Sequence, residues 1–151
     1  MIQRIQSFFL AMVLTLGIAS LFVPFVRYDL PGGPINVDLM PGATLHPLSG
    51  IYLLPVFLNI VSILFTVYVI LNYKKRVFQM KLANLLMALN TILLGVLLLF
   101  DFVELPVTTE LLQKKYLLGA FFPIFSIIFS FLASYFIRKD ENLVRSADRL
   151  R

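Results

Sequence analysis

The acidic residues Asp101 and Glu104 are the pair whose types and spacing come closest to a chemical site. They lie three residues apart, so a helix would place both carboxylates on one face. Two carboxylates can hold a hard cation when carbonyl groups and water complete its coordination shell. A metal site is therefore one interpretation. We favour the other, in which both acids mark a membrane boundary, with Lys114 and Lys115 able to neutralise them across a loop.

The chain offers little else for catalysis. His46 is its only histidine and it has no cysteine, so the usual zinc ligand sets are missing. No serine has a histidine base near it in the sequence. Gly32-Gly33 lies between prolines and does not open a helix, unlike a phosphate-binding loop. We expect no enzymatic activity and no cofactor.

Long apolar runs account for most of the chain. The sequence is 60% hydrophobic and 14% charged, whereas soluble domains are about half apolar and a quarter charged. The runs cover residues 7–26, 51–73, 82–100 and 116–137, each long enough to cross a bilayer core of about 30 Å as a helix. None holds an ionisable group well inside it, which argues against a pump or proton-coupled carrier. The sequence predicts an all-α membrane protein, a four transmembrane helix bundle forming one domain over residues 1–151.

The first run has a competing interpretation as a cleaved signal peptide. Signal peptides have apolar regions of about 7–15 residues that end at a small-x-small site. Residues 7–26 are longer and have no such site beside them. We therefore expect the first run to be retained as a membrane span.

The segments outside the runs differ in character. The outer loop, residues 27–50, is rich in proline and glycine, and Ile35 to Leu39 alternates apolar with polar residues. That alternation predicts a small β-hairpin, with an irregular loop as the alternative. The tail, residues 138–151, is densely charged and predicts a short amphipathic helix at the membrane surface.

The basic residues predict an orientation. With both termini inside, ten of the 13 Lys and Arg residues lie on the inner side and three on the outer side. This is a strong positive-inside bias, so we expect both termini in the cytoplasm and the basic residues near anionic lipid. The net charge of +5 therefore indicates membrane topology rather than binding to nucleic acid. The inner set is Arg4, Lys74, Lys75, Arg76, Lys81, Arg138, Lys139, Arg145, Arg149 and Arg151, and the outer set is Arg27, Lys114 and Lys115.

Small and polar residues recur at helical spacing within the runs. Lipid gives little hydrophobic drive between helices, so close approach through small residues and polar contacts takes over. We expect these faces to meet inside the bundle. A polar transport path is one alternative, and a face turned outward to another protein is a second. The packing residues are Ala11, Thr15 and Ala19 in the first run, Asn59, Ser62 and Thr66 in the second, Asn84 and Asn90 in the third, and Gly119, Ser126, Ser130 and Ser134 in the fourth.

Both ends of the chain resemble an uncharacterised bacterial family, domain of unknown function 4293. The resemblance is carried by the opening Met1-Ile2-Gln3-Arg4-Ile5-Gln6-Ser7 and by the tail from Lys139 to Arg151, Lys-Asp-Glu-Asn-Leu-Val-Arg-Ser-Ala-Asp-Arg-Leu-Arg. It implies a small integral protein of the inner membrane of Bacteroidetes-type bacteria. It implies no activity.

The two termini combine acidic, basic and apolar residues in a more defined pattern than a membrane-orienting basic segment needs. We expect them to form a cytoplasmic docking face for a larger membrane protein complex, with an interfacial helix lying on membrane lipid as the alternative. The predicted function is a non-enzymatic accessory or scaffold subunit of an inner-membrane assembly. The alternative is a small carrier or channel for a neutral or lipid-like substrate. The docking residues are Gln3, Arg4, Glu141, Arg145, Asp148 and Arg149.

Overall fold

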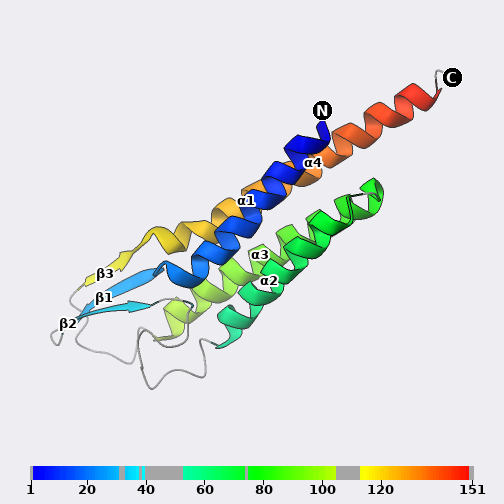
Figure 1. Cartoon of the computed structure of the whole chain (residues 1–151). Coiled ribbons are helices and arrows are strands. Elements are labelled where there is room, and N and C mark those ends of the chain that lie inside the picture. Colours follow the sequence, from blue (N-terminus) through cyan, green and yellow to red (C-terminus); the bar gives the residue numbers. More distant parts are fainter. Residues whose placement is uncertain are drawn as a thin grey trace.

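The computed structural model of the chain describes residues 2–30, 33–37, 39, 53–73, 75–104 and 113–149. Its long helices are α1 (Ile2–Phe22), α2 (Leu53–Leu71), α3 (Arg76–Glu104) and α4 (Phe122–Arg149) (Figure 1). Four stretches are long and apolar enough to cross a membrane, namely Ile5–Phe22, Leu54–Leu71, Arg76–Leu99 and Leu118–Val144, the last of which begins just before α4. The predicted four-helix membrane fold is confirmed.

The helices form a ring in which each packs against two neighbours. α1 contacts α2 and α4, and α3 also contacts α2 and α4. Figure 1 shows both termini and the turn between α2 and α3 at one end of the bundle, and the strands at the other. We call these the termini end and the sheet end. The bundle therefore runs up, down, up and down.

The predicted hairpin is present and belongs to a larger sheet. Strands β1 (Val26–Leu30) and β2 (Gly33–Val37) pair antiparallel, with Val26 opposite Val37. A third strand, β3 (Gln113–Tyr116), pairs antiparallel with the other edge of β1 and gives the order β2-β1-β3. No strand was predicted from the sequence in this segment.

At the sheet end, the boundaries of the first and last spans differ from the sequence prediction. The first helix ends at Phe22, two residues before Pro24, and Val26 is the first residue of β1. The last helix begins at Phe122 after a 3-10 turn, η2 (Leu118–Phe121). Proline restricts the residue before it to extended conformations, and pairing with β1 holds residues 113–116 in a strand. The proline therefore accounts for the end of the first helix, and the sheet accounts for the late start of the last.

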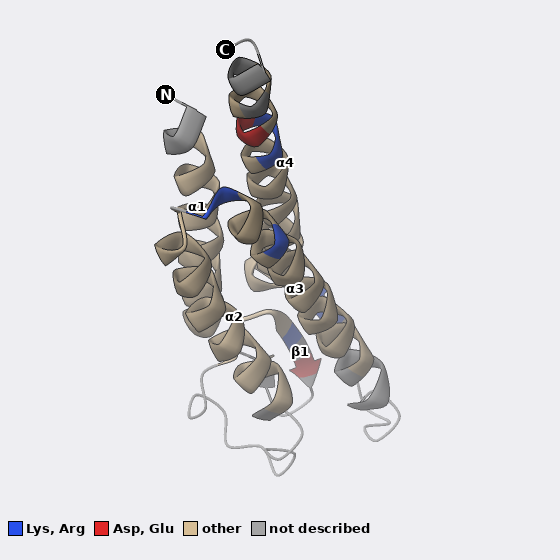
Figure 2. Cartoon of the chain, turned by 90° about the vertical axis from the view of Figure 1, so that its right-hand side faces the viewer, with Lys and Arg blue, Asp and Glu red and all other residues tan. Residues whose placement is uncertain are grey.

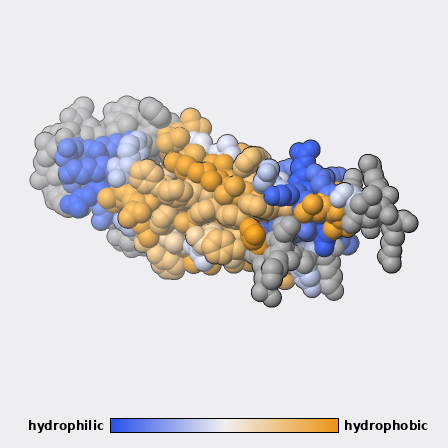
Figure 3. Space-filling view, turned by 90° about the horizontal axis from the view of Figure 1, so that it is seen from above, coloured by the Kyte–Doolittle hydropathy of each residue, from blue (hydrophilic) through white to orange (hydrophobic). Residues whose placement is uncertain are grey.

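The outside of the bundle is apolar and its ends are charged. Large side chains such as Phe57, Leu64 and Leu99 are more than 60% exposed, as expected for residues that face lipid. Figure 3 shows the resulting apolar band between two hydrophilic ends. In the described part of the chain, lysine, arginine, aspartate and glutamate gather toward these ends (Figure 2). The interior holds an apolar cluster that includes Leu10 and Leu86.

Candidate functional site

Neutral polar side chains are buried along the whole bundle. They come from all four helices, so the interior is not purely apolar. All three residues predicted on α2 are among them, as are Asn90 and the three α4 serines. The sequence analysis missed Gln6, Ser20 and Gln79. The buried polar residues are Gln6, Ser20, Asn59, Ser62, Thr66, Gln79, Asn90, Ser126, Ser130 and Ser134.

Asn59 joins α2 to α1. Its Nδ2 donates to the Gly17 carbonyl oxygen at 3.2 Å and to Ser20 Oγ at 2.9 Å. Ser20 Oγ in turn donates to the Gly17 carbonyl at 2.7 Å. A Cβ at Gly17 would stand 3.0 Å from Ile63 Cγ1, so the two helices approach closely at this glycine. The amide of Asn59 is thereby held by backbone and side chain together.

Asn90 joins α3 to α2. Ser62 Oγ donates to Asn90 Oδ1 at 3.2 Å, and Asn90 Nδ2 donates to the Leu86 carbonyl at 2.9 Å. Thr66 Oγ1 donates to the Ser62 carbonyl at 2.7 Å. Nearer the termini end, Gln79 Nε2 donates to the carbonyl of Val69 at 3.2 Å. Each of these amides forms a hydrogen bond inside the bundle, as buried polar groups in an apolar medium must.

The buried serines of α4 differ in their hydrogen bonding. Ser134 Oγ donates to Asn84 Oδ1 on α3 at 2.6 Å. Ser126 is 3% exposed, and Ser130 is fully buried with no hydrogen-bond partner for its Oγ. On the other side of α4, Gln6 Nε2 donates to the Phe136 carbonyl at 3.2 Å. Ser130 is thus a buried hydroxyl that the described protein groups leave unsatisfied.

The predicted packing face on α1 requires correction. Ala11 and Thr15 are exposed on the outside of the bundle, and Ala19 is half-buried. The opposite face of α1 packs inward instead, because Phe9 stacks on Phe129 and Phe136 with centroid distances of 6.1 and 5.4 Å. On α3, Asn84 is exposed, yet it makes a polar contact across helices as predicted, because its Oδ1 accepts from Ser134 Oγ on α4.

Gly119 also differs from its predicted role in helix packing. It lies in η2, where its amide donates to the Pro24 carbonyl at 3.2 Å. A Cβ at this position would stand 2.6 Å from the Val23 carbonyl oxygen and 2.7 Å from that of Pro24. Only glycine fits this approach without movement of the backbone. Gly119 therefore fixes the start of the last span to the end of the first.

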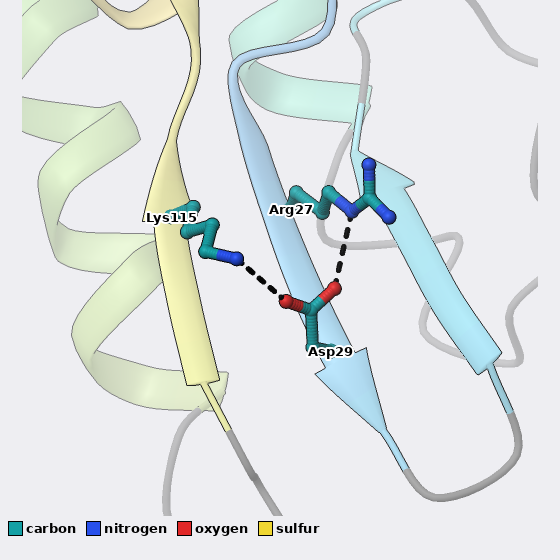
Figure 4. Close-up of polar contacts among 3 residues, drawn as sticks. All are labelled: Arg27, Asp29 and Lys115. Carbon is teal, nitrogen blue, oxygen red and sulfur yellow. Dashed lines mark hydrogen bonds and ion pairs between the residues drawn. The ribbon is translucent and has the colours of Figure 1, made fainter.

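An ionic cluster lies on the sheet (Figure 4). Asp29 Oδ1 accepts from Arg27 Nε at 3.1 Å, and Asp29 Oδ2 accepts from Lys115 Nζ at 3.2 Å. The hydrogen bond from Lys115 is the largest cause that lowers the pKa of Asp29, followed by that from Arg27, against an opposing effect of desolvation. Lys114 Nζ lies 4.7 Å from the centroid of the Tyr116 ring, a cation–π geometry. This cluster was not predicted from the sequence, because Lys115 reaches Asp29 only through the pairing of β1 with β3.

The metal interpretation gains no support from the described residues. Within them, no group of three or more His, Cys, Asp or Glu residues is placed to hold a metal ion. Asp101 and Glu104 lie near the end of α3, and their side chains are outside the described part, as is His46. Lys115 Nζ lies 3.2 Å from Asp29 Oδ2, and the expected neutralisation of that pair by Lys114 and Lys115 falls outside the described part.

The termini end holds the predicted docking residues. α4 is one helix up to Arg149, so the charged tail continues the last span. Figure 1 shows the start of α1 beside α4, with α4 extending farther. Arg76 Nη1 lies 3.4 Å from Asp140 Oδ2. Gln3 and Arg4 lie in the first turns of α1. We call residues 141–149, the part of α4 that follows Asp140, the extension. Glu141 is half-buried there, and the extension also carries Arg145, Asp148 and Arg149, whose side chains are outside the described part.

Comparison with known proteins gives one match. The family model described as Domain of unknown function (DUF4293) matches residues 2–150. No match was found among curated proteins or among solved structures. The match covers all four apolar helices, the sheet and most of the tail. The chain therefore belongs to the DUF4293 family, as a multi-pass membrane protein.

Proposed function

We propose that this protein is a non-enzymatic accessory subunit of a larger assembly in a bacterial inner membrane, and that the extension of α4 docks its partner. The observation that carries the proposal is the continuity of α4 from Phe122 to Arg149. The helix leaves the bundle at the termini end and continues beyond it (Figure 1). A straight continuation points away from the membrane, whereas a helix lying on lipid would need a bend after the span.

The surface of the extension supports docking. Leu143 is 49% exposed and Val144 is 38% exposed, although both lie on a segment dominated by charge. A projecting helix gains little stability from its own backbone in water, so burial of these apolar side chains on a partner would stabilise it. The ion pair between Arg76 and Asp140 holds the helix direction at the point where it leaves the bundle.

The interior of the bundle supports a non-enzymatic role. Its buried polar groups are neutral, and most bond to each other or to backbone carbonyls, as Asn59 and Asn90 do. Catalysis by general acids and bases requires titratable groups beside the reacting atoms. In the described parts of the spans, the interior side chains supply none of these.

The proposed orientation of the protein in the membrane can be tested directly by cysteine labelling, because the chain has no cysteine of its own. Asn142→Cys places a thiol on the extension and Asn36→Cys places one on β2. We expect a membrane-impermeant maleimide to label position 36 in intact spheroplasts and position 142 only after the membrane is opened. Labelling of position 142 from outside would overturn the cytoplasmic placement.

The docking proposal is tested by purification from native membranes in mild detergent at native abundance. We expect a larger membrane protein in fixed stoichiometry with the chain. The double variant R145A/D148A should lose this partner while its membrane content is unchanged. K114Q, which removes a charge at the sheet end, is the matched control. Retention of the partner by R145A/D148A would refute docking through the extension.

A second candidate function, a small carrier for a neutral or lipid-like substrate, is favoured by Ser130. Its hydroxyl is fully buried and has no hydrogen-bond partner within the described part of the chain, and buried polar groups are ordinarily satisfied by protein or bound molecules. Under this candidate, purified protein retains a small molecule or lipid that S130A loses. Equal composition of both preparations by mass spectrometry would remove the candidate.

A further inference from the structure

We propose that Lys81, Asn84 and Arg138 bind the phosphate group of an anionic phospholipid on the lipid-facing side of the contact between α3 and α4. The proposal is independent of partner docking, because it uses different residues. It concerns a binding site inside the membrane boundary, at the termini end of the bundle.

The contact between Asn84 and Ser134 sets the site. Ser134 Oγ donates to Asn84 Oδ1 at 2.6 Å, which fixes the amide of an exposed side chain. This is the amide's only hydrogen bond within the described residues, so its Nδ2 donors have no acceptor there. A phosphate oxygen is an acceptor that accepts from neutral and charged donors alike.

Two cations flank this amide. Lys81 precedes Asn84 by three residues on α3, and Arg138 follows Ser134 by four residues on α4. Residues three or four apart lie on the same side of a helix. Because α3 and α4 run antiparallel, both cations lie about one turn from the contact, toward the termini end. Figure 2 shows basic residues on both helices at this end.

Both cations are available. Lys81 and Arg138 are exposed, and neither forms an ion pair with a carboxylate in the described chain. The nearby carboxylate of Asp140 faces Arg76 instead, at 3.4 Å. A basic residue that only sets the orientation of the protein needs to be on the correct side of the membrane and nothing more. Here two cations without a carboxylate partner and an amide nitrogen without an acceptor, within the described residues, lie on one side of one helix pair.

The surface below the site fits an acyl chain, which favours a lipid over free phosphate. Ala88, Thr91 and Gly95 continue from Asn84 along the outside of α3 toward the middle of the membrane. Thr91 Oγ1 donates to the Met87 carbonyl at 2.9 Å and presents no free donor. A Cβ at Gly95 would meet nothing within 4 Å. These small residues leave a smooth apolar path beside the phosphate-binding groups.

The test is a titration of the purified full chain in detergent with phosphatidylglycerol, followed by native mass spectrometry. We expect one tightly bound lipid, a clear preference over phosphatidylcholine, and no competition by inorganic phosphate or glycerol 3-phosphate. K81Q and R138Q should each weaken binding about fivefold, the loss typical for one cation at a charged lipid surface. N84L should weaken it as well. All three positions are exposed, and circular dichroism checks that each variant is folded.

K75Q and K139Q are the matched controls, because they remove exposed cations at the same end that do not flank Asn84. Binding should be unchanged in both. Equal losses in the controls would show that lipid binds through general charge and would overturn the site. Competition by soluble phosphate would show an anion site without lipid specificity and would also overturn the proposal.

Discussion

Arg76 Nη1 and Asp140 Oδ2 lie 3.4 Å apart and join the first residue of α3 to α4 where α4 leaves the bundle. The two side chains are 33% and 15% exposed, so the carboxylate is the more enclosed partner. Among the described residues its Oδ2 has no hydrogen bond, and Arg76 forms an ion pair with it. The pair therefore couples the loop between α2 and α3 to the direction of the extension.

This relationship predicts unequal effects of the two single substitutions. R76Q leaves an enclosed carboxylate without its cation and should lower the free energy of unfolding by about 1–3 kcal/mol. D140N should cost less, because the arginine can turn toward water. The double variant R76Q/D140N should recover part of the loss of R76Q. A double-mutant cycle measured by unfolding in detergent checks this, and strictly additive effects would contradict coupling.

The amide of Asn59 should contribute measurably to the stability of the bundle. Asn59→Ala removes the bonds to Gly17 and Ser20 and should lower the free energy of unfolding by about 0.6–2 kcal/mol. Thr15→Ala is the matched control, because Thr15 is exposed and bonds only within its own helix. It should stay within about 0.5 kcal/mol of the parent. Equal effects of both substitutions would argue against the contact between α1 and α2.

Two glycine substitutions should differ sharply. Gly119→Ala would force a methyl group against the backbone oxygens of Val23 and Pro24, so η2 must move and the pairing of β1 with β3 should weaken. We expect a loss of about 2 kcal/mol or more. Gly95→Ala has open space and also gains helix propensity, so its stability should be equal or higher. Thermal unfolding of both variants is the measurement, and a neutral Gly119→Ala would refute the close approach.

The ionic cluster on the sheet predicts a dependence on pH. The pKa of Asp29 is lowered in the folded protein, mainly by Lys115, so its stabilising contribution is present above its ordinary value of 3.8 and is lost as pH falls through the folded pKa. Lys115→Met should raise the pKa of Asp29 toward that ordinary value. The pKa of Asp29 in the parent and in the Lys115→Met variant can be measured from the carboxyl carbon chemical shift, followed by NMR as pH is changed. An unchanged Asp29 titration in Lys115→Met would contradict the cluster.

Much of the fold could be predicted because the length of an uninterrupted apolar run is enough to identify a membrane span. The hairpin was also predictable, since Ile35 to Leu39 alternates in polarity and follows a turn. Strand β3 could not be predicted, because Gln113–Tyr116 contains two lysines and forms a strand only against β1, which is remote in sequence. The requirement for glycine at position 119 could not be predicted for the same reason, because it arises from close approach to the backbone at Val23 and Pro24.

The packing faces were predictable only in part. Polar residues such as Asn59 and Ser62 must find partners in an apolar medium, so their burial follows from their chemistry. Small residues such as Ala11 carry no such demand, because they fit a lipid-facing surface as well as a helix contact. The phenylalanine stack of Phe9 with α4 decided which face of α1 turns inward, and sequence spacing does not rank one face over the other.

The proposed docking role is tested most directly by a photo-crosslinking amino acid placed at Leu143 in intact cells. The account predicts an adduct with a discrete larger membrane protein from this position. Ile128, which is exposed within the apolar band, is the control position and should yield no such adduct. An absence of any protein adduct at position 143, or an adduct at twice the chain's own 17.2 kDa, would contradict docking of a larger partner on the extension of α4.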